Sequence, residues 1–202
     1  MPFRGSAIVL RAMSGDTPDS SLVARARDGD RAAFEELTRR HASRIHGVVR
    51  RLGASQDEAD EITQEAFLRA WRGIAGFNGD SQFFTWLCSI AINESRREIR
   101  RRLSRGTLLS LDKDGAQEPP DPSADPYRST ASTELRHRLE DAVRGLPVKY
   151  RAPLILRDVE GLTTEDAAAV LGLSESAFKS RLHRARRAVQ MALDDYPARA
   201  DS

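Results

Sequence analysis

The stretch from Thr163 to Arg187 constrains the fold of this chain most strongly, because it carries capping signals for two helices and the turn between them. Thr163 can cap the first helix, with Asp166 at the capping-box position. Gly172 supplies a left-handed residue that ends this helix, and Ser174 can cap the next one. The pattern predicts two helices joined by a short turn, which is the geometry of a helix-turn-helix.

The second of these helices is expected to have two chemically different faces. The inward face is apolar and comprises Ala177, Phe178, Leu182, Ala185 and Val189. The other face carries five cations with no acid between Ser176 and Arg187, namely Lys179, Arg181, Arg184, Arg186 and Arg187. An ordinary helical hairpin with a solvated basic face is the alternative. Because phosphate neutralisation dominates nucleic-acid affinity, the density of cations favours DNA binding.

The rest of the chain also has helical periodicity, and no segment has the alternation of a strand. Predicted helix caps are Asp30, Ser55 with Glu58, and Ser81. A segment rich in proline, glycine and acids interrupts this pattern at residues 104–132, and it has too few apolar residues to fold alone. We therefore predict an all-α protein with two small helical domains joined by a flexible linker.

The domain boundaries are predicted from these changes in pattern. They are a disordered N-terminal extension (residues 1–19), a first helical domain (20–103), the linker (104–132), a second helical domain (133–195) and a tail (196–202). Because the periodicity begins only near Ser20, Met13 is an alternative start to Met1. Within the second domain, Pro153 is expected early in a helix from Val148 to Val159, where it resets the first turn.

Charge is segregated along the chain, although the formal net charge is only +2. Residues 93–105 carry six arginines and two glutamates, whereas residues 106–131 carry five acids and two basic residues. Such local potential steers binding more than total charge does. Cys88 is the only cysteine, which excludes an internal disulfide and a cysteine-based zinc site. Because a single cysteine suits a reducing compartment and no apolar run approaches the ~18–20 residues that a membrane span needs, we expect a cytoplasmic protein. The four histidines are scattered without ligand spacing, so we expect no metal or other cofactor.

Four aromatic residues crowd into the segment before the arginine run: Phe77, Phe83, Phe84 and Trp86. A glycine-containing loop accompanies them, and Asn93 follows. Single-stranded bases are held by such groups, since bases stack on aromatic faces while cations follow the backbone. A core aromatic cluster beside a solvated basic helix end is the other interpretation, and the residues alone leave both open.

The helix predicted at residues 60–71 presents another choice. Its inward face is small and apolar, comprising Ala59, Ile62, Ala66 and Ala70. The other faces then carry Asp60, Gln64, Phe67, Leu68 and Trp71. A partly exposed large apolar group beside acids indicates a protein partner. The alternative is that both aromatic side chains belong to the core.

Together these segments resemble bacterial sigma factors of the sigma-70 family, in the extracytoplasmic-function (ECF) group. DEITQEAFLRAW at residues 60–71 resembles region 2.2, which docks on the clamp of the RNA polymerase β′ subunit. FNGDSQFFTWLCSIAIN at residues 77–93 resembles regions 2.3 and 2.4, which melt the −10 element and capture a flipped base. Residues 145–186 resemble region 4, which reads the −35 element and contacts the β flap.

The resemblance implies roles for particular residues. The polymerase-docking face would comprise Asp60, Gln64, Glu65, Phe67 and Arg69. The −10 element would be met by Phe77, Asn78, Gly79, Asp80, Ser81, Trp86, Asn93, Arg96 and Arg97. The −35 major groove or its phosphates would be met by Lys179, Ser180, Arg181 and Arg184. Implied partners are core RNA polymerase, bound through the β′ clamp and the β flap, promoter DNA and an anti-sigma factor.

Four residues depart from the common pattern of the family: Cys88, Ile92, Glu175 and Ala177. The last two lie at the start of the recognition helix, where side chains reach base edges, which leaves the preferred −35 sequence open. Two other classes of protein remain as alternatives. A freestanding helix-turn-helix regulator would bind duplex DNA tightly without polymerase. A nucleic-acid enzyme would need a phosphate loop, a metal cluster or a nucleophile–base motif, and the sequence contains no such pattern.

Overall fold

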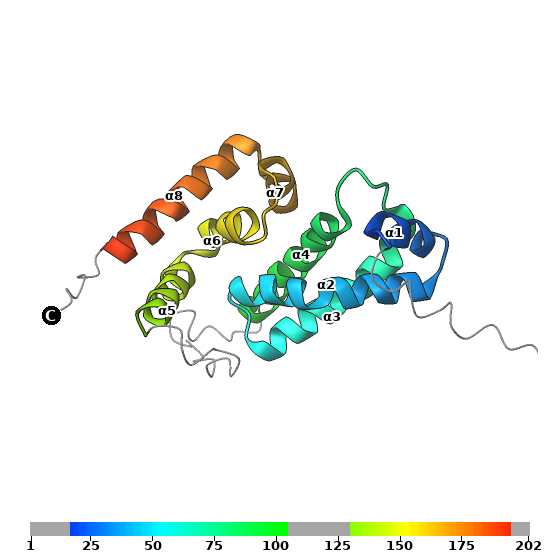
Figure 1. Ribbon diagram of the computed structural model, residues 1–202, viewed down its shortest axis with the longest axis horizontal. Helices are drawn as coiled ribbons and strands as arrows, with labels where there is room; N and C mark the ends of the chain where they lie inside the picture. Colours follow the sequence, from blue (N-terminus) through cyan, green and yellow to red (C-terminus); the bar gives the residue numbers. More distant parts are fainter. Residues whose placement is uncertain (1–16, 105–129, 195–202) are drawn as a thin grey trace, which may run out of the picture.

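The computed structural model describes residues 17–104 and 130–194, and all regular elements in these ranges are helices (Figure 1). Most of the predicted N-terminal extension (1–16), most of the predicted linker (105–129) and the tail from residue 195 lie outside the described residues. The described part confirms the predicted all-α fold, with one group of helices before the linker and one group after it.

The first group, called here the N-terminal half, consists of α1 (Asp19–Arg27), α2 (Arg31–Arg51), α3 (Gln56–Gly73) and α4 (Phe83–Ser104). A short 3-10 turn, Ile74–Gly76, follows α3. The second group, the C-terminal half, consists of α5 (Thr130–Gly145), α6 (Val148–Leu154), α7 (Thr164–Leu171) and α8 (Glu175–Asp194). A π-helical turn, Ile155–Val159, continues directly from α6 and is called the π turn below.

Local capping sets the start of α2 and of α3, as predicted. The Asp30 carboxylate accepts a hydrogen bond from the Ala33 amide at 3.1 Å. Ser55 and Glu58 form a complete capping box, in which the Ser55 amide donates to the Glu58 carboxylate at 2.8 Å and the Glu58 amide donates to the Ser55 hydroxyl at 3.4 Å. Each cap satisfies amides that have no partner inside the helix.

Two local predictions differ from the structure. Ser81 does not cap α4, which begins at Phe83, because the carbonyl that accepts from the Trp86 amide (3.1 Å) belongs to Gln82. Pro153 lies near the end of α6 and is buried, so it does not reset the first turn. The helix then widens into the π turn, where the Glu160 amide donates to the Ile155 carbonyl at 2.9 Å.

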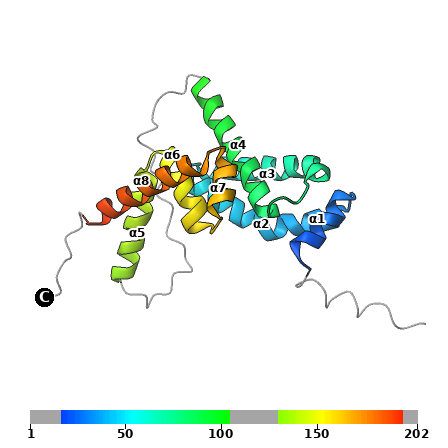
Figure 2. The same cartoon turned by 90° about the horizontal axis from the view of Figure 1, so that it is seen from above.

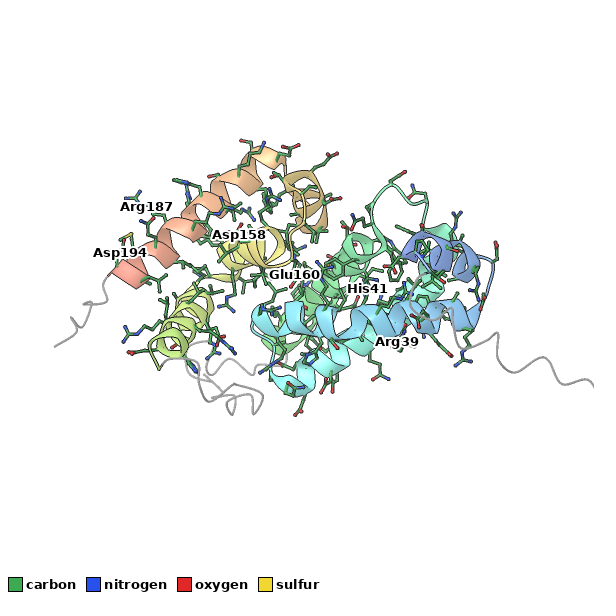
Figure 3. All side chains as sticks on the ribbon, in the orientation of Figure 1. Arg39, His41, Asp158, Glu160, Arg187 and Asp194 are labelled. Atoms are coloured by element: carbon green, nitrogen blue, oxygen red, sulfur yellow. The ribbon has the colours of Figure 1, made fainter. Side chains whose placement is uncertain are left out.

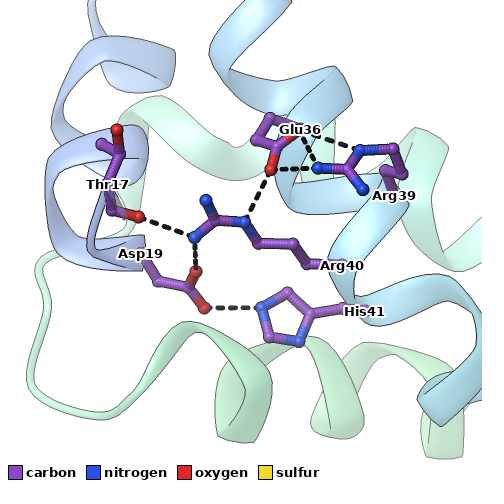
Figure 4. Close-up of polar contacts among 6 residues, drawn as sticks. All are labelled: Thr17, Asp19, Glu36, Arg39, Arg40 and His41. Atoms are coloured by element: carbon purple, nitrogen blue, oxygen red, sulfur yellow. Dashed lines mark hydrogen bonds and ion pairs between the residues drawn. The ribbon is translucent and has the colours of Figure 1, made fainter. Parts of the chain in front are cut away.

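A polar cluster fastens α1 to α2 (Figure 4). Arg40 donates to the Thr17 carbonyl at 2.7 Å, to Asp19 at 3.0 Å and to Glu36 at 2.7 Å. The other Asp19 oxygen lies 2.6 Å from Nε2 of His41. Hydrogen bonds from Arg39 and Arg40 hold the pKa of the Glu36 carboxyl below its ordinary value. The first helix is therefore positioned by ionic contacts as well as by its buried Leu22, Val23 and Ala26.

The hydrophobic core runs through both halves. In the N-terminal half, α2, α3 and α4 pack around fully buried side chains that include Leu37, Ile45, Val48, Val49 and Leu87. In the C-terminal half, Phe178 of α8 is completely buried, and α8 packs against α5, α6 and α7. Helix α7 packs on α4, and both views show the two helices side by side (Figure 1, Figure 2).

Candidate nucleic-acid interfaces

The helix-turn-helix forms as its capping pattern predicts. The Thr163 hydroxyl accepts from the Asp166 amide at 3.0 Å and donates to the Asp166 carboxylate at 2.7 Å. Gly172 has φ 66° and ψ 39°, a left-handed conformation that turns the chain between α7 and α8. The Ser174 hydroxyl accepts from the Ala177 amide at 3.3 Å and starts α8. Of the predicted inner face, Phe178, Leu182, Ala185 and Val189 are buried, whereas Ala177 is only half-buried.

The outer face of α8 presents the predicted −35 residues. Lys179, Ser180 and Arg184 are exposed, and Arg181 is half-buried. Lys179 lies 2.7 Å from the carboxylate of Glu175, one turn earlier on the same helix. The Arg184 guanidinium donates to the Tyr150 hydroxyl at 3.5 Å, and this bond is the main cause of a lowered pKa of Tyr150.

Asp158 forms an ion pair with one of the five cations on α8, Arg186. It lies between α6 and α8, whereas Arg187 projects from the outer side of α8 (Figure 3). The Arg186 guanidinium makes two hydrogen bonds to the Asp158 carboxylate, at 2.9 and 2.5 Å. This contact raises the pKa of Arg186 and turns its charge toward the π turn. Arg186, one of the five cations predicted to share one face, is therefore engaged in an exposed ion pair with the C-terminal half itself.

The aromatic cluster contributes both to the core and to the surface. Phe77, Phe83 and Phe84 are buried, which supports the core interpretation for these three rings. Trp86 is only partly buried and packs against Phe77, with ring centroids 4.9 Å apart and planes 32° apart. Phe83 also contacts Trp86, with ring centroids 5.9 Å apart, so two buried rings support this partly exposed indole.

The loop before α4 is organised by its own polar side chains. Asn78, Gly79 and Asp80 are exposed and Ser81 is half-buried. The Asn78 side-chain amide donates to the Asp80 carboxylate, and the Asp80 amide donates back to the Asn78 side chain at 3.4 Å. Gly79 has φ 85°, a conformation that other residues rarely adopt. The turn presents amide and carboxylate groups beside Trp86.

The polar side of α4 continues from Trp86 to the arginine run. Asn93 lies seven residues after Trp86, which is two helical turns along the same face. Asn93, Arg96 and Arg97 are all exposed. Arg96 contacts the Asn93 side chain at 3.5 Å and donates to the Leu171 carbonyl of α7 at 3.2 Å. Arg97 lies 3.5 Å from the buried Glu94.

The predicted polymerase-docking residues lie along α3, but they are not equally exposed. Asp60 and Gln64 are exposed, Glu65 and Arg69 are half-buried, and Phe67 is 7% exposed. Arg69 bridges Glu65 at 2.8 Å and Glu94 of α4 at 3.0 Å. Arg69 therefore also ties α3 to α4.

A mostly apolar groove of about 860 Å³ lies between α2 and α3. Its lining includes Phe34, Thr38, His46, Gln64, Phe67 and Trp71. Leu68, which the sequence pattern places on an outer face of this helix but which is not among the predicted docking residues, is 43% exposed and also lines the groove.

Other kinds of site were also sought within residues 17–104 and 130–194. No group of three or more histidine, cysteine, aspartate or glutamate side chains in these ranges is arranged to hold a metal ion. No helix among the described residues combines the length and the apolar character needed to cross a membrane.

Similarity to known proteins extends over nearly the whole chain. Residues 37–105 match the family model for sigma-70 region 2, and residues 136–189 match the model for sigma-70 region 4. The RNA polymerase sigma-H factor of Pseudomonas aeruginosa is 33% identical over 180 residues, covering 87% of this chain and 93% of that protein. The ECF RNA polymerase sigma-E factor of Escherichia coli K12 is 32% identical over 182 residues, covering 88% and 95%.

A solved structure has the same arrangement of helices. CnrH, in its complex with the cytosolic domain of CnrY, superposes with a TM-score of 0.64 at 28% identity, covering 89% of this chain and 99% of CnrH. The two family models fall on the two helical halves, in the order that the sequence motifs predict. The chain therefore belongs to the sigma-70 family of RNA polymerase sigma factors, in its ECF group.

Proposed function

We propose that this chain is a promoter-specificity subunit, which binds core RNA polymerase in the cytoplasm, directs it to promoters and opens the DNA there. The observation that carries the proposal is the presence of two separate nucleic-acid surfaces on one chain. One is the cationic outer face of α8, and the other is the side of α4 that carries Trp86 and Asn93. Such a chain selects and opens DNA by binding energy rather than by covalent catalysis.

At the −35 element, α8 enters the major groove. Lys179 and Ser180 lie near the start of the helix, where side chains reach base edges. Arg181 and Arg184 supply charge to the flanking phosphates, which increases affinity for any sequence. Tyr150 orients Arg184 from α6 through the hydrogen bond between the hydroxyl and the guanidinium.

At the −10 element, α4 and the preceding loop hold the opened strand. A base stacks on Trp86 while residues 77–81 line its pocket, and the side-chain amide of Asn93 reads a base edge. Each captured base contributes roughly 1–3 kcal/mol. This gain offsets the lost stacking of DNA, which averages about 1.4 kcal/mol per step. Arg96 and Arg97 follow the phosphates of the strand.

The polymerase docks on α3 and the adjoining groove. Asp60 and Gln64 supply exposed polar contacts, Leu68 supplies an exposed apolar one, and Phe67 shapes the groove from within. The β′ clamp is the partner at this surface, and the β flap is the partner of the C-terminal half. An anti-sigma factor is the further partner that the family membership implies.

Promoter-selective transcription with paired variants tests the proposal. Start sites are first mapped by sequencing the 5′ ends of RNA made by core polymerase with this chain. Lys179→Ala should weaken transcription and reduce its response to −35 changes, whereas Asn93→Ala should reduce its response to −10 changes, because each of these residues is placed at the base edges of one element. We expect about a tenfold loss of discrimination, within the 1–3 kcal/mol of a good base contact.

Each variant is the control for the other, since both leave α3 unchanged and should still co-purify with core polymerase. A gel shift with and without core enzyme separates the freestanding regulator from the proposed subunit. Tight duplex binding by the chain alone, unaffected by polymerase, would contradict the proposal.

A further inference from the structure

Glu160 is a buried carboxylate at the point where the C-terminal half meets the N-terminal half. It follows the π turn, and its side chain is only 5% exposed. A charge removed from water in this way is costly unless it is paired and hydrogen-bonded. The groups that pair with Glu160 therefore show what holds this junction together.

Both partners of Glu160 belong to α2, more than one hundred residues earlier in the chain. Nε of Arg44 donates to the carboxylate at 2.8 Å, and Nη2 of the same side chain donates to the Glu160 carbonyl at 2.6 Å. Arg51 contacts the other carboxylate oxygen at 3.3 Å. The Arg44 guanidinium also lies 3.5 Å above the centre of the Phe84 ring, which fixes its direction.

Two further arginines join the halves on either side of Glu160. Arg151, from α6, donates to the Leu52 carbonyl at the end of α2 at 3.1 Å. Arg96, from α4, donates to the Leu171 carbonyl at the end of α7 at 3.2 Å. The junction is thus made of side chains from each half that reach across to the other, with α7 packed on α4. Figure 3 shows Glu160 at the side of the C-terminal half that faces α2 and α4.

This closed arrangement engages part of the α4 surface that the proposed function assigns to the opened strand. It holds the helix-turn-helix against α4, and it engages Arg96 beside Asn93. The two promoter elements lie a couple of helical turns apart, at about 34 Å per turn. The C-terminal half must leave α4 before α8 and α4 can reach both elements together.

We propose that Glu160, held by Arg44 and Arg51, is an intramolecular latch that keeps this chain closed in the absence of any partner. Releasing the latch frees α4 and allows the two halves to separate. The consequence for DNA binding rests on the proposed function, whereas the closure itself does not.

The thiol of Cys88 provides a reporter of the latch. Cys88 lies on α4, is fully buried, and is close enough to Glu160 and Arg44 for both charges to affect it. It is also the only cysteine in the chain, so its reaction with Ellman's reagent can be followed in the full-length protein without other changes.

Glu160→Gln is the test variant, and Glu165→Gln is its matched control. Both remove one negative charge from the C-terminal half, but Glu165 is exposed on α7. Because breaking a buried ion pair is strongly destabilising to the contact, we expect Glu160→Gln to react at least about tenfold faster than the wild-type chain. The control should react at the wild-type rate.

Circular dichroism checks that both variants keep their helices. Small-angle X-ray scattering should show a larger radius of gyration only for Glu160→Gln.

A double-mutant cycle tests the pairing itself. Arg44→Ala should accelerate the reaction in the wild-type background but have a smaller effect in the Glu160→Gln background, because the ion pair with the carboxylate is already lost there and only the bond to the Glu160 carbonyl and the contact with Phe84 remain. Wild-type reactivity and an unchanged radius for folded Glu160→Gln would overturn the latch, and so would additive effects of the two substitutions.

Binding of a labelled pool of single-stranded DNA separates the latch from the proposed function. If closure covers α4, Glu160→Gln should bind this pool more tightly than the wild-type chain in the absence of polymerase. A faster thiol reaction and a larger radius without tighter binding would support the latch and count against the DNA role of α4.

Discussion

At the scale of single residues, the buried thiol of Cys88 makes the stability of the chain depend on pH. Burial raises the pKa of this thiol from 9.0 to about 12, and Glu160 adds to the increase while Arg44 opposes it. The folded chain therefore keeps the proton over a range in which the unfolded chain releases it. The stabilising contribution is complete below pH 9 and is lost as the pH rises toward 12.

Urea unfolding at pH 8 and at a more alkaline pH, under reducing conditions, measures this effect. The free energy of unfolding of the wild-type chain should fall more between the two pH values than that of Cys88→Ala. The difference should not exceed about 1.4 kcal/mol per pH unit, which is the limit for one proton. Other titrating groups are common to both chains and cancel in the comparison. Identical pH dependence in the two chains would exclude a shifted thiol.

At the scale of elements, Gly172 fixes the angle between α7 and α8. A Cβ atom placed there would meet nothing within 4 Å, so only the left-handed backbone conformation opposes another residue. We expect Gly172→Ala to lower the free energy of unfolding by about 1 kcal/mol, and Gly172→Asn to lower it less, because asparagine tolerates this conformation better.

Gly145→Ala is the control for this substitution. Gly145 ends α5, its Cβ would also meet nothing within 4 Å, and its φ is not in the left-handed region. Alanine should therefore be neutral or slightly stabilising at this position. Equal effects of the two substitutions in chemical denaturation would show that the turn geometry does not set the cost.

Most elements could be predicted from the sequence because their ends are set by nearby residues. Asp30, Ser55 and Thr163 each bond an amide three residues later, so the signal for each cap lies within one turn. The prediction that Ser81 caps α4 was wrong. Serine is a common cap residue, but Ser81 lies two residues before the first residue of α4 and not directly before it. The π turn after Pro153 was not predicted, because a widened turn depends on packing and has no local residue signature.

Some features of the candidate site are also set by nearby residues and could be predicted, whereas others depend on residues far apart in the sequence. The cationic face of α8 follows from helical periodicity, and so does the burial of Phe178. The pairing of Arg186 with Asp158 could not be predicted in this way, because the two residues are 28 positions apart in the sequence and come together only in the folded chain. Likewise, the sequence left open whether Phe77 and Trp86 belong to the core or to the surface, and only the packed structure shows that Phe77 is buried and Trp86 partly exposed.

At the scale of the whole molecule, the contact between Glu160 and Arg44 spans 116 residues and has no local signal in the sequence. The sequence shows that arginines are abundant, but it does not indicate which arginine pairs with a buried carboxylate. This long-range junction joins the cores of the two halves into one continuous cluster. It should therefore make the two halves unfold together, since coincident transitions are the mark of one cooperative unit.

The positions of the tryptophans allow this cooperativity to be measured directly. The chain has only Trp71 and Trp86, and both belong to the N-terminal half, so tryptophan fluorescence reports that half alone. Far-UV circular dichroism reports the helices of both halves.

In the wild-type chain the two urea transitions should coincide. In Glu160→Arg, which places a cation against Arg44 and Arg51, the circular dichroism signal should begin to fall at a lower urea concentration than fluorescence, because the C-terminal half loses its support. Glu165→Arg, with the same charge change at an exposed position, should keep the transitions coincident. Separate transitions in the wild-type chain would show that the junction does not couple the halves.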